Sequence, residues 1–137
     1  MKPGFYFDCV LLVDDDPVTN FLNERTLVEL GLTHHIQTTE SPQEALNFIS
    51  SCYKAKDDPK YMLIMLDLNM PFWDGFEFLD ELQSKMTFSL NKIDIIILSS
   101  SSHLTDTERA KNYRILDYLE KPLTAEKLIS ALSKKLK

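Results

Sequence analysis

The chain alternates short apolar runs with longer segments in which apolar residues recur at helical spacing. Nearly continuous apolar runs occupy residues 9–13, 61–66 and 93–98. Runs of this length are typical of strands that are buried on both faces of a sheet. We therefore expect three central strands, at about residues 8–13, 61–66 and 93–98.

Two weaker segments complete the set of strands. Residues 35–38 mix polar and apolar side chains, as an edge strand does. Residues 115–119 are a second short apolar segment, close to the end of the chain. The pattern thus predicts five strands.

Helical segments lie between and after these strands, and several carry start and stop signals. Pro17 suits a first helical position and Gly31 the residue just past a helix end. Ser41 to Glu44 reads as a capping box, and Gly75 suits a tight entry into a helix. Helices are expected at about residues 17–30, 75–85 and 106–112, and two more are expected to begin at about residues 42 and 124. In the last of them a single apolar stripe is expected from Ala125, Leu128, Ile129, Leu132 and Leu136.

Alternating strands and helices predict an α/β fold with a parallel sheet covered on both faces. At 137 residues the chain is expected to form a single domain, and no second-domain linker is evident. In such folds ligands bind beyond the carboxyl ends of the strands. The functional site is therefore expected at that edge.

Polar residues follow four of the predicted strands at this edge. Asp14 and Asp15 follow the first strand, Asp67 ends the third, Ser99 follows the fourth and Lys121 follows the fifth. Clustered carboxylates repel one another unless a cation lies between them, and Mg²⁺ prefers oxygen ligands. The pattern indicates a Mg²⁺-dependent phosphoacceptor site.

Composition narrows the class of function. A net charge of −6 argues against nonspecific nucleic-acid binding. Only three glycines are present, which excludes a glycine-rich phosphate loop. We find no apolar stretch of membrane-spanning length and no signal peptide, and the two cysteines lack CxxC spacing. A cytoplasmic protein with reduced thiols is expected.

Each polar residue of the site can be given a role. Asp67 is the expected nucleophile, which would form an aspartyl phosphate. Asp15 and Asp67 are the expected direct Mg²⁺ ligands, with Asp14 acting through water and the Asn69 carbonyl as a further ligand. Lys121 can pair with Asp67 and later with a phosphoryl oxygen. Taken alone, the run of aspartates from 14 to 16 could equally be a solvated helix cap, and we expect Asp16 to be one.

Two further residues have a functional and a plain interpretation. Ser99 could bond a phosphoryl group, or it could be a turn residue in a run of four serines. Tyr118 could move between buried and exposed positions, or simply be a half-buried strand residue. The bond between Lys121 and Pro122 is a candidate cis peptide that would fix the direction of the lysine.

Four segments in this order resemble the receiver domain of bacterial two-component response regulators, the CheY-like family. They are residues 11–17, 66–75, 95–100 and 117–123. The resemblance implies a (βα)5 flavodoxin-like doubly wound sandwich with strand order 2-1-3-4-5. It implies a single receiver domain over residues 1–137, with no output domain.

The resemblance also implies a function. A sensor histidine kinase or a histidine phosphotransfer protein would phosphorylate Asp67, with Mg²⁺ (or Mn²⁺) held by Asp14, Asp15, Asp67 and the Asn69 carbonyl. Ser99 and Tyr118 would then move and switch the face formed by residues 105–135 for a downstream target protein. Such a protein is a regulatory phosphoacceptor that catalyses only its own phosphorylation and dephosphorylation. It would be a monomer or a phosphorylation-dependent dimer.

This sequence departs from the usual family pattern at three positions. Ser99 stands where threonine is commoner, Ser100 where alanine is usual, and Arg114 where many members have glycine. None of these changes removes a catalytic group.

Three rival interpretations stay open. An aspartate-nucleophile phosphatase similar to haloacid-dehalogenase-type hydrolases needs a general acid where this chain has Asn69. A degenerate receiver that only binds protein would not need the complete acidic set and Lys121. A flavin-binding domain of the same topology would need a phosphate-binding loop.

Overall fold

The computed structural model describes residues 7–53, 61–68, 75–85, 92–100 and 104–134. Strands and helices alternate along the chain, as expected. Their order is β1 (Cys9–Val13), α1 (Pro17–Leu30), β2 (Ile36–Thr39), α2 (Pro42–Cys52), β3 (Met62–Asp67), α3 (Gly75–Lys85), β4 (Ile93–Ser99), α4 (Leu104–Ala110), β5 (Asp117–Glu120) and α5 (Ala125–Ser133).

The five strands form one parallel sheet in the order β2-β1-β3-β4-β5. The three strands expected in the centre lie there, and every residue of β1 and β3 is buried. Val13 at the end of β1 pairs with Leu66 in β3, and Asp67 pairs with Leu98 in β4. This register brings the carboxyl ends of the central strands to the same edge.

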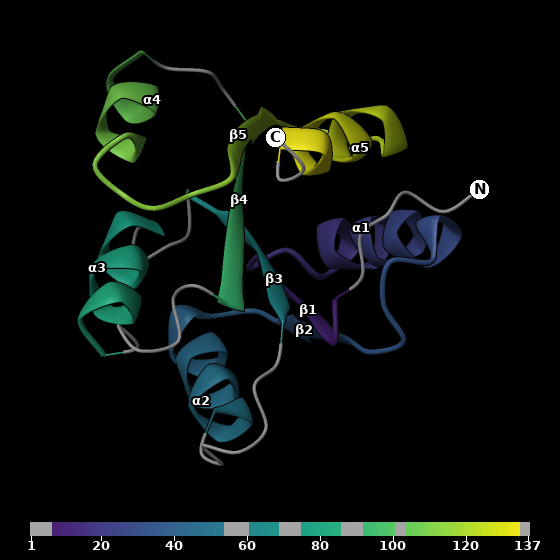
Figure 1. The fold of residues 1–137 in the computed structure, drawn as a ribbon, viewed down its shortest axis with the longest axis horizontal. Helices are drawn as coiled ribbons and strands as arrows, with labels where there is room; N and C mark the ends of the chain where they lie inside the picture. Colours follow the sequence, from purple (N-terminus) through teal and green to yellow (C-terminus); the bar gives the residue numbers. More distant parts are fainter. Residues whose placement is uncertain (1–6, 54–60, 69–74, 86–91, 101–103, 135–137) are drawn as a thin grey trace.

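Helices cover both faces of the sheet (Figure 1): α1 and α5 lie on one face, and α2, α3 and α4 on the other. Successive strand side chains alternate between the two layers. Val10 and Leu12 pack in a core with Leu27 and Leu128, while Leu11 packs in the opposite core. This three-layer arrangement is a flavodoxin-like sandwich, as the sequence predicted.

The expected helix caps are present, with one difference. Gly31 follows α1 in the left-handed conformation, at φ 64°, and donates its N–H to the carbonyl of Leu27. Ser41 caps α2 by accepting from the N–H of Glu44. The Glu44 carboxylate, however, accepts from the N–H of Glu40, one residue before the cap.

Two elements have a boundary two residues away from the predicted one. The fourth helix begins and ends two residues earlier than predicted, at Leu104–Ala110. Residues 111–113 instead donate their N–H groups three residues back, which is a tightened helix end rather than another α-turn. The last strand covers Asp117–Glu120 rather than 115–119, although the N–H of Leu116 already donates to the Ile95 carbonyl at 2.7 Å.

The inward faces of α1 and α5 differ from a simple apolar stripe. In α5, Ile129 is 39% exposed, and Ala131 is buried together with Leu128 and Leu132. Of the other two residues of the predicted stripe, Ala125 is half-buried and residue 136 lies outside the described residues. In α1 the buried residues are Asn20, Asn23 and Leu27, whereas Val18, Phe21, Leu22 and Val28 are exposed. Of the helices described, none is both long and apolar enough to cross a membrane.

Candidate functional site

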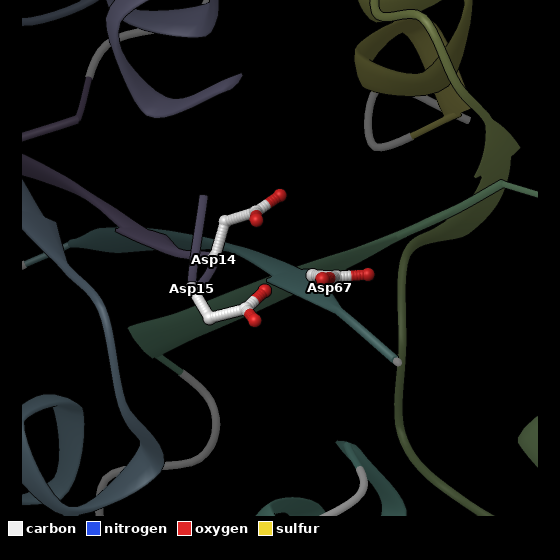
Figure 2. Close-up of side chains that lie close together, drawn as sticks. All are labelled: Asp14, Asp15 and Asp67. Atoms are coloured by element: carbon white, nitrogen blue, oxygen red, sulfur yellow. The ribbon is translucent and has the colours of Figure 1, made fainter. Parts of the chain in front are cut away.

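Three carboxylates gather at the carboxyl edge of the sheet. One carboxylate oxygen from each of Asp14, Asp15 and Asp67 lies within 4.8 Å of the other two. Figure 2 shows Asp14 and Asp15 at the end of β1 and Asp67 at the end of β3. Asp14 and Asp67 are only 4% and 5% exposed, while Asp15 is exposed to solvent. The cluster is therefore a partly buried concentration of negative charge that is open on one side.

The strand register explains why these residues meet. Val13 and Leu66 are paired neighbours in the sheet, so the residue after each one lies at the same level. The N–H of Asp14 donates to the carbonyl of Thr39 in β2 at 3.1 Å. Asp14 thus continues the hydrogen bonding of the sheet before the chain turns into α1.

Lys121 brings one positive charge to this cluster from the other side. Its Nζ donates to Asp14 Oδ2 at 2.9 Å and lies 3.4 Å from Asp67 Oδ1. Its backbone N–H donates to the carbonyl of Ser99 at 2.7 Å, which ties the segment after β5 to the end of β4. The bond between Lys121 and Pro122 is cis, as the sequence suggested.

The neighbouring acids govern the charge of Lys121. Burial by itself would lower the pKa of the Lys121 ammonium, since desolvation disfavours the charged form. Hydrogen bonds and charge interactions with Asp14 and Asp67 together outweigh burial, and the pKa of Lys121 is raised. Lys121 is therefore a fixed positive charge at neutral pH.

The donor set suits a hard divalent cation. Among the described residues, three carboxylates with one lysine beside them leave an excess of negative charge. Oxygen ligands of this kind, in a partly buried cluster that is exposed at Asp15, match the preferences of Mg²⁺. Asp14, Asp15 and Asp67 are the described residues that would hold it, and Asn69 lies outside the described residues.

Asp16 is not part of the cluster. Its carboxylate caps α1, accepting from the N–H of Val18 at 3.0 Å and from the Thr19 hydroxyl at 3.0 Å. The hydrogen bond from the Thr19 hydroxyl has the larger effect and the one from the Val18 N–H the smaller, and both lower the pKa of the Asp16 carboxyl. The third aspartate of the run is a helix cap, as expected.

Ser99 and Tyr118 lie on neighbouring strands beside the site. Ser99 is the last residue of β4 and is fully buried. Tyr118 in β5 is half-buried and packs against the core that contains α2 and α3. Ser99 lies next to the cluster through its bond with Lys121, whereas the position of Tyr118 is that of a half-buried strand tyrosine.

Two polar residues that sequence reasoning did not single out also support the site. Asn20 in α1 is buried and donates to the carbonyls of Asp14 and Thr39. Lys127 in α5 donates to the carbonyls of Glu120 and Pro122, on either side of Lys121. The spacing of residues 20, 23 and 27 places these side chains on one helix face, but nothing in the sequence marks that face as the inward one.

Comparisons with known proteins agree with this architecture. Residues 10–133 match the family model described as the response regulator receiver domain. The chain is 32% identical over 124 residues to the transcriptional regulatory protein MalR of Bacillus subtilis, covering 90% of this chain and 48% of that protein. It is 29% identical to the probable C4-dicarboxylate response regulator DctR of Halalkalibacterium halodurans, covering 90% of this chain and 49% of that protein. The chain thus spans about half the length of the curated relatives it matches.

Solved structures give the same result. A two-component response regulator from Cytophaga hutchinsonii superimposes with a TM-score of 0.85 at 32% identity, covering 96% of this chain and 98% of that one. A response regulator receiver protein from Dyadobacter fermentans superimposes with a TM-score of 0.80 at 29% identity, covering 93% and 97%.

Proposed function

Since this chain belongs to the response regulator receiver domain family, we propose that it is a phosphoacceptor whose Asp67 receives a phosphoryl group. The observation that carries the proposal is the position of Asp67: a buried carboxylate that lies beside two further aspartates and one lysine. Proteins of this family are regulatory rather than classical enzymes. We propose that the only chemistry of this chain is its own phosphorylation and dephosphorylation.

The transfer step needs little from the protein beyond position and charge. A carboxylate oxygen of Asp67 would form a bond to phosphorus while the donor's bond to phosphorus breaks. With a phosphohistidine donor, the electron pair of the breaking P–N bond returns to the imidazole nitrogen. The product is an aspartyl phosphate on Asp67.

Charge neutralisation follows from the residues of the cluster. Mg²⁺, when bound by Asp14, Asp15 and Asp67, would neutralise charge on the phosphoryl oxygens. Lys121 lies 3.4 Å from Asp67, close enough to pair with an added phosphoryl oxygen after a small movement. The Asn69 carbonyl remains a proposed ligand.

Movements of Ser99 and Tyr118 would transmit the phosphorylation of Asp67 to the surface of the protein. Ser99 is buried at the end of β4, one strand away from Asp67, and its hydroxyl is the group that we expect to follow a phosphoryl group. Tyr118 lies half-buried on the next strand, and it would become more buried on phosphorylation. We propose that the surface built by α4, β5 and α5, within residues 105–135, is altered in this way and contacts a target protein. Self-association through the same surface is a further proposal.

The phosphodonor would reach the site over α1. Val18, Phe21 and Leu22 near the start of this helix are 63%, 59% and 55% exposed, which is unusual for apolar side chains beside one another. They lie near the carboxylate edge, because α1 begins at Pro17, two residues after Asp15. We propose that a sensor histidine kinase or a histidine phosphotransfer protein packs against them during transfer.

Intact-mass measurement after incubation with acetyl phosphate tests the central proposal. A single phosphoryl adduct should form on the wild type with Mg²⁺, and none should form with excess chelator or on Asp67→Asn. Asp16→Asn is a matched control, because asparagine also caps helices and Asp16 lies outside the cluster. It should form the adduct as the wild type does.

Other results would favour the rivals. An adduct on Asp67→Asn would place the phosphoacceptor elsewhere. Steady release of phosphate from small phosphate esters would indicate a phosphatase. A folded wild type that takes no phosphoryl group from acetyl phosphate or from a phosphohistidine protein would be a binding module only.

A further inference from the structure

Asn20 is a buried polar residue on the inward face of α1. It is 3% exposed, and its Nδ2 donates to the carbonyl of Asp14 at 3.0 Å and to the carbonyl of Thr39 at 3.2 Å. Because carbonyls can only accept, this geometry identifies the amide nitrogen. One side chain therefore joins α1 to the ends of β1 and β2.

Burying the side-chain amide of Asn20 at this position is energetically unfavourable. The Oδ1 of Asn20 is buried and has no hydrogen-bond partner among the described residues. A buried acceptor without a partner destabilises a fold, and an apolar side chain at this position would avoid that penalty. The penalty is consistent with a role other than stability.

The hydrogen bond from Asn20 to the carbonyl of Asp14 constrains the backbone that carries both the Asp14 and the Asp15 carboxylates. The carbonyl of Asp14 belongs to the peptide unit that joins Asp14 to Asp15, and this unit is planar. The N–H of Asp14 is held by Thr39, whose carbonyl also receives the second bond from Asn20. With both main-chain groups of Asp14 held, the direction in which the Asp14 side chain leaves the backbone and the position of the Asp15 Cα are constrained together.

We propose that Asn20 is a positioning residue for the acidic cluster, which it serves by clamping the Asp14–Asp15 peptide rather than by touching the ion or the phosphoryl group. The inference rests on the proposed Mg²⁺ site. Groups one step removed from a metal ligand orient that ligand, and their removal typically weakens metal binding by about 10- to 100-fold.

Asn23 provides a matched control within the same helix. It is buried, at 7% exposure, and lies one turn further along the same face. Among the described residues it makes no hydrogen bond to Asp14, Asp15 or Thr39. Replacing it changes a buried amide without touching the clamp.

The test is Mg²⁺ titration by isothermal calorimetry on the wild type, Asn20→Leu and Asn23→Leu, with thermal unfolding measured in chelator for each. Asn20→Leu should raise the Kd for Mg²⁺ about 10-fold and slow adduct formation at subsaturating Mg²⁺, while its Tm changes no more than that of Asn23→Leu. Asn23→Leu should bind Mg²⁺ as the wild type does. If Asn20→Leu does not unfold cooperatively, Asn20→Ser, which keeps one donor in a smaller side chain, should show a smaller rise in Kd.

A folded Asn20 variant with a Kd within about twofold of the wild type would overturn the inference. Equal weakening by Asn23→Leu would also overturn it, because the effect would then belong to helix packing. A wild type that binds no Mg²⁺ would instead overturn the proposed function itself, and with it this inference.

Discussion

The ammonium group of Lys121 lies closer to Asp14 than to Asp67, at 2.9 Å against 3.4 Å. A single lysine therefore neutralises parts of two buried acids that come from different strands. This places Lys121 at the centre of the charge balance of the site. The free energy of folding should depend on it more than on an exposed lysine.

Replacing Lys121 by methionine should lower the free energy of unfolding by about 1–3 kcal/mol in chelator, because two buried carboxylates lose their ion pair with its ammonium group. Removal of a positive charge should also tighten Mg²⁺ binding, so Mg²⁺ should stabilise the variant more than the wild type. Urea denaturation with chelator and with Mg²⁺ measures both effects. Lys111→Met is the control, since its ion pair with Glu108 is exposed and should contribute little. Equal changes in unfolding free energy for Lys121→Met and Lys111→Met would show that Lys121 does not offset the charge of the two buried carboxylates.

The contribution of Lys121 to stability should have a defined pH dependence. Its pKa is raised in the folded protein above the ordinary value of 10.5. The folded state thus binds the proton more tightly, so the contribution is complete below pH 10.5 and is lost as the pH rises through the folded pKa. The difference in unfolding free energy between wild type and Lys121→Met should be constant from pH 7 to about 10 and narrow above that. A difference that grows with alkaline pH would mean that the shift has the opposite sign.

Replacing Asp67 by asparagine should stabilise the protein in metal-free buffer. The change removes one of three carboxylates whose oxygens lie within 4.8 Å of one another, and Lys121 keeps its closer partner, Asp14. We expect a gain on the order of 1 kcal/mol, measured as a rise in Tm in the presence of chelator. Mg²⁺ should reverse the order by stabilising only the wild type appreciably. A lower Tm for the variant in chelator would show that repulsion in the cluster is already compensated.

Gly75 should not tolerate a side chain. A Cβ at this position would lie 2.7 Å from Leu68 Cδ2 and 2.9 Å from Leu68 Cα, and the second contact is with backbone. Gly75→Ala should therefore displace the start of α3 from the end of β3, beside Asp67, and cost about 1–3 kcal/mol. Chemical denaturation measures the cost, and the rate of adduct formation should fall as well. Unchanged stability would indicate that the two segments can separate freely.

The inward face of α1 can be tested with two adjacent residues. Leu27 is fully buried, whereas Val28 is 63% exposed. Leu27→Ala should cost about 2–5 kcal/mol, while Val28→Ala should change the unfolding free energy by less than about 0.5 kcal/mol. Urea denaturation of the two variants measures this difference. A large loss for Val28→Ala would mean that α1 is rotated so that Val28 faces the sheet.

The alternation of strands and helices, the central strands and the edge at which the polar residues meet could all be predicted from the sequence. These features follow from local causes: apolar runs of strand length, caps such as Gly31 and Ser41, and the rule that parallel strands end together. Asp14, Asp15, Asp67 and Lys121 could be placed together from the sequence because each is the last residue of a strand or lies within two residues of its end.

The tertiary structure alone decided how those residues share their contacts. The closer pairing of Lys121 with Asp14 joins residues 107 positions apart in sequence, and it depends on how β5 docks against β4. The inward rotation of α1 had the same origin: polar Asn20 faces the sheet because two strand-end carbonyls lie there to accept its hydrogen bonds. Hydrophobic periodicity cannot reveal such a face, since it records which residues avoid water and not which polar groups find a buried partner.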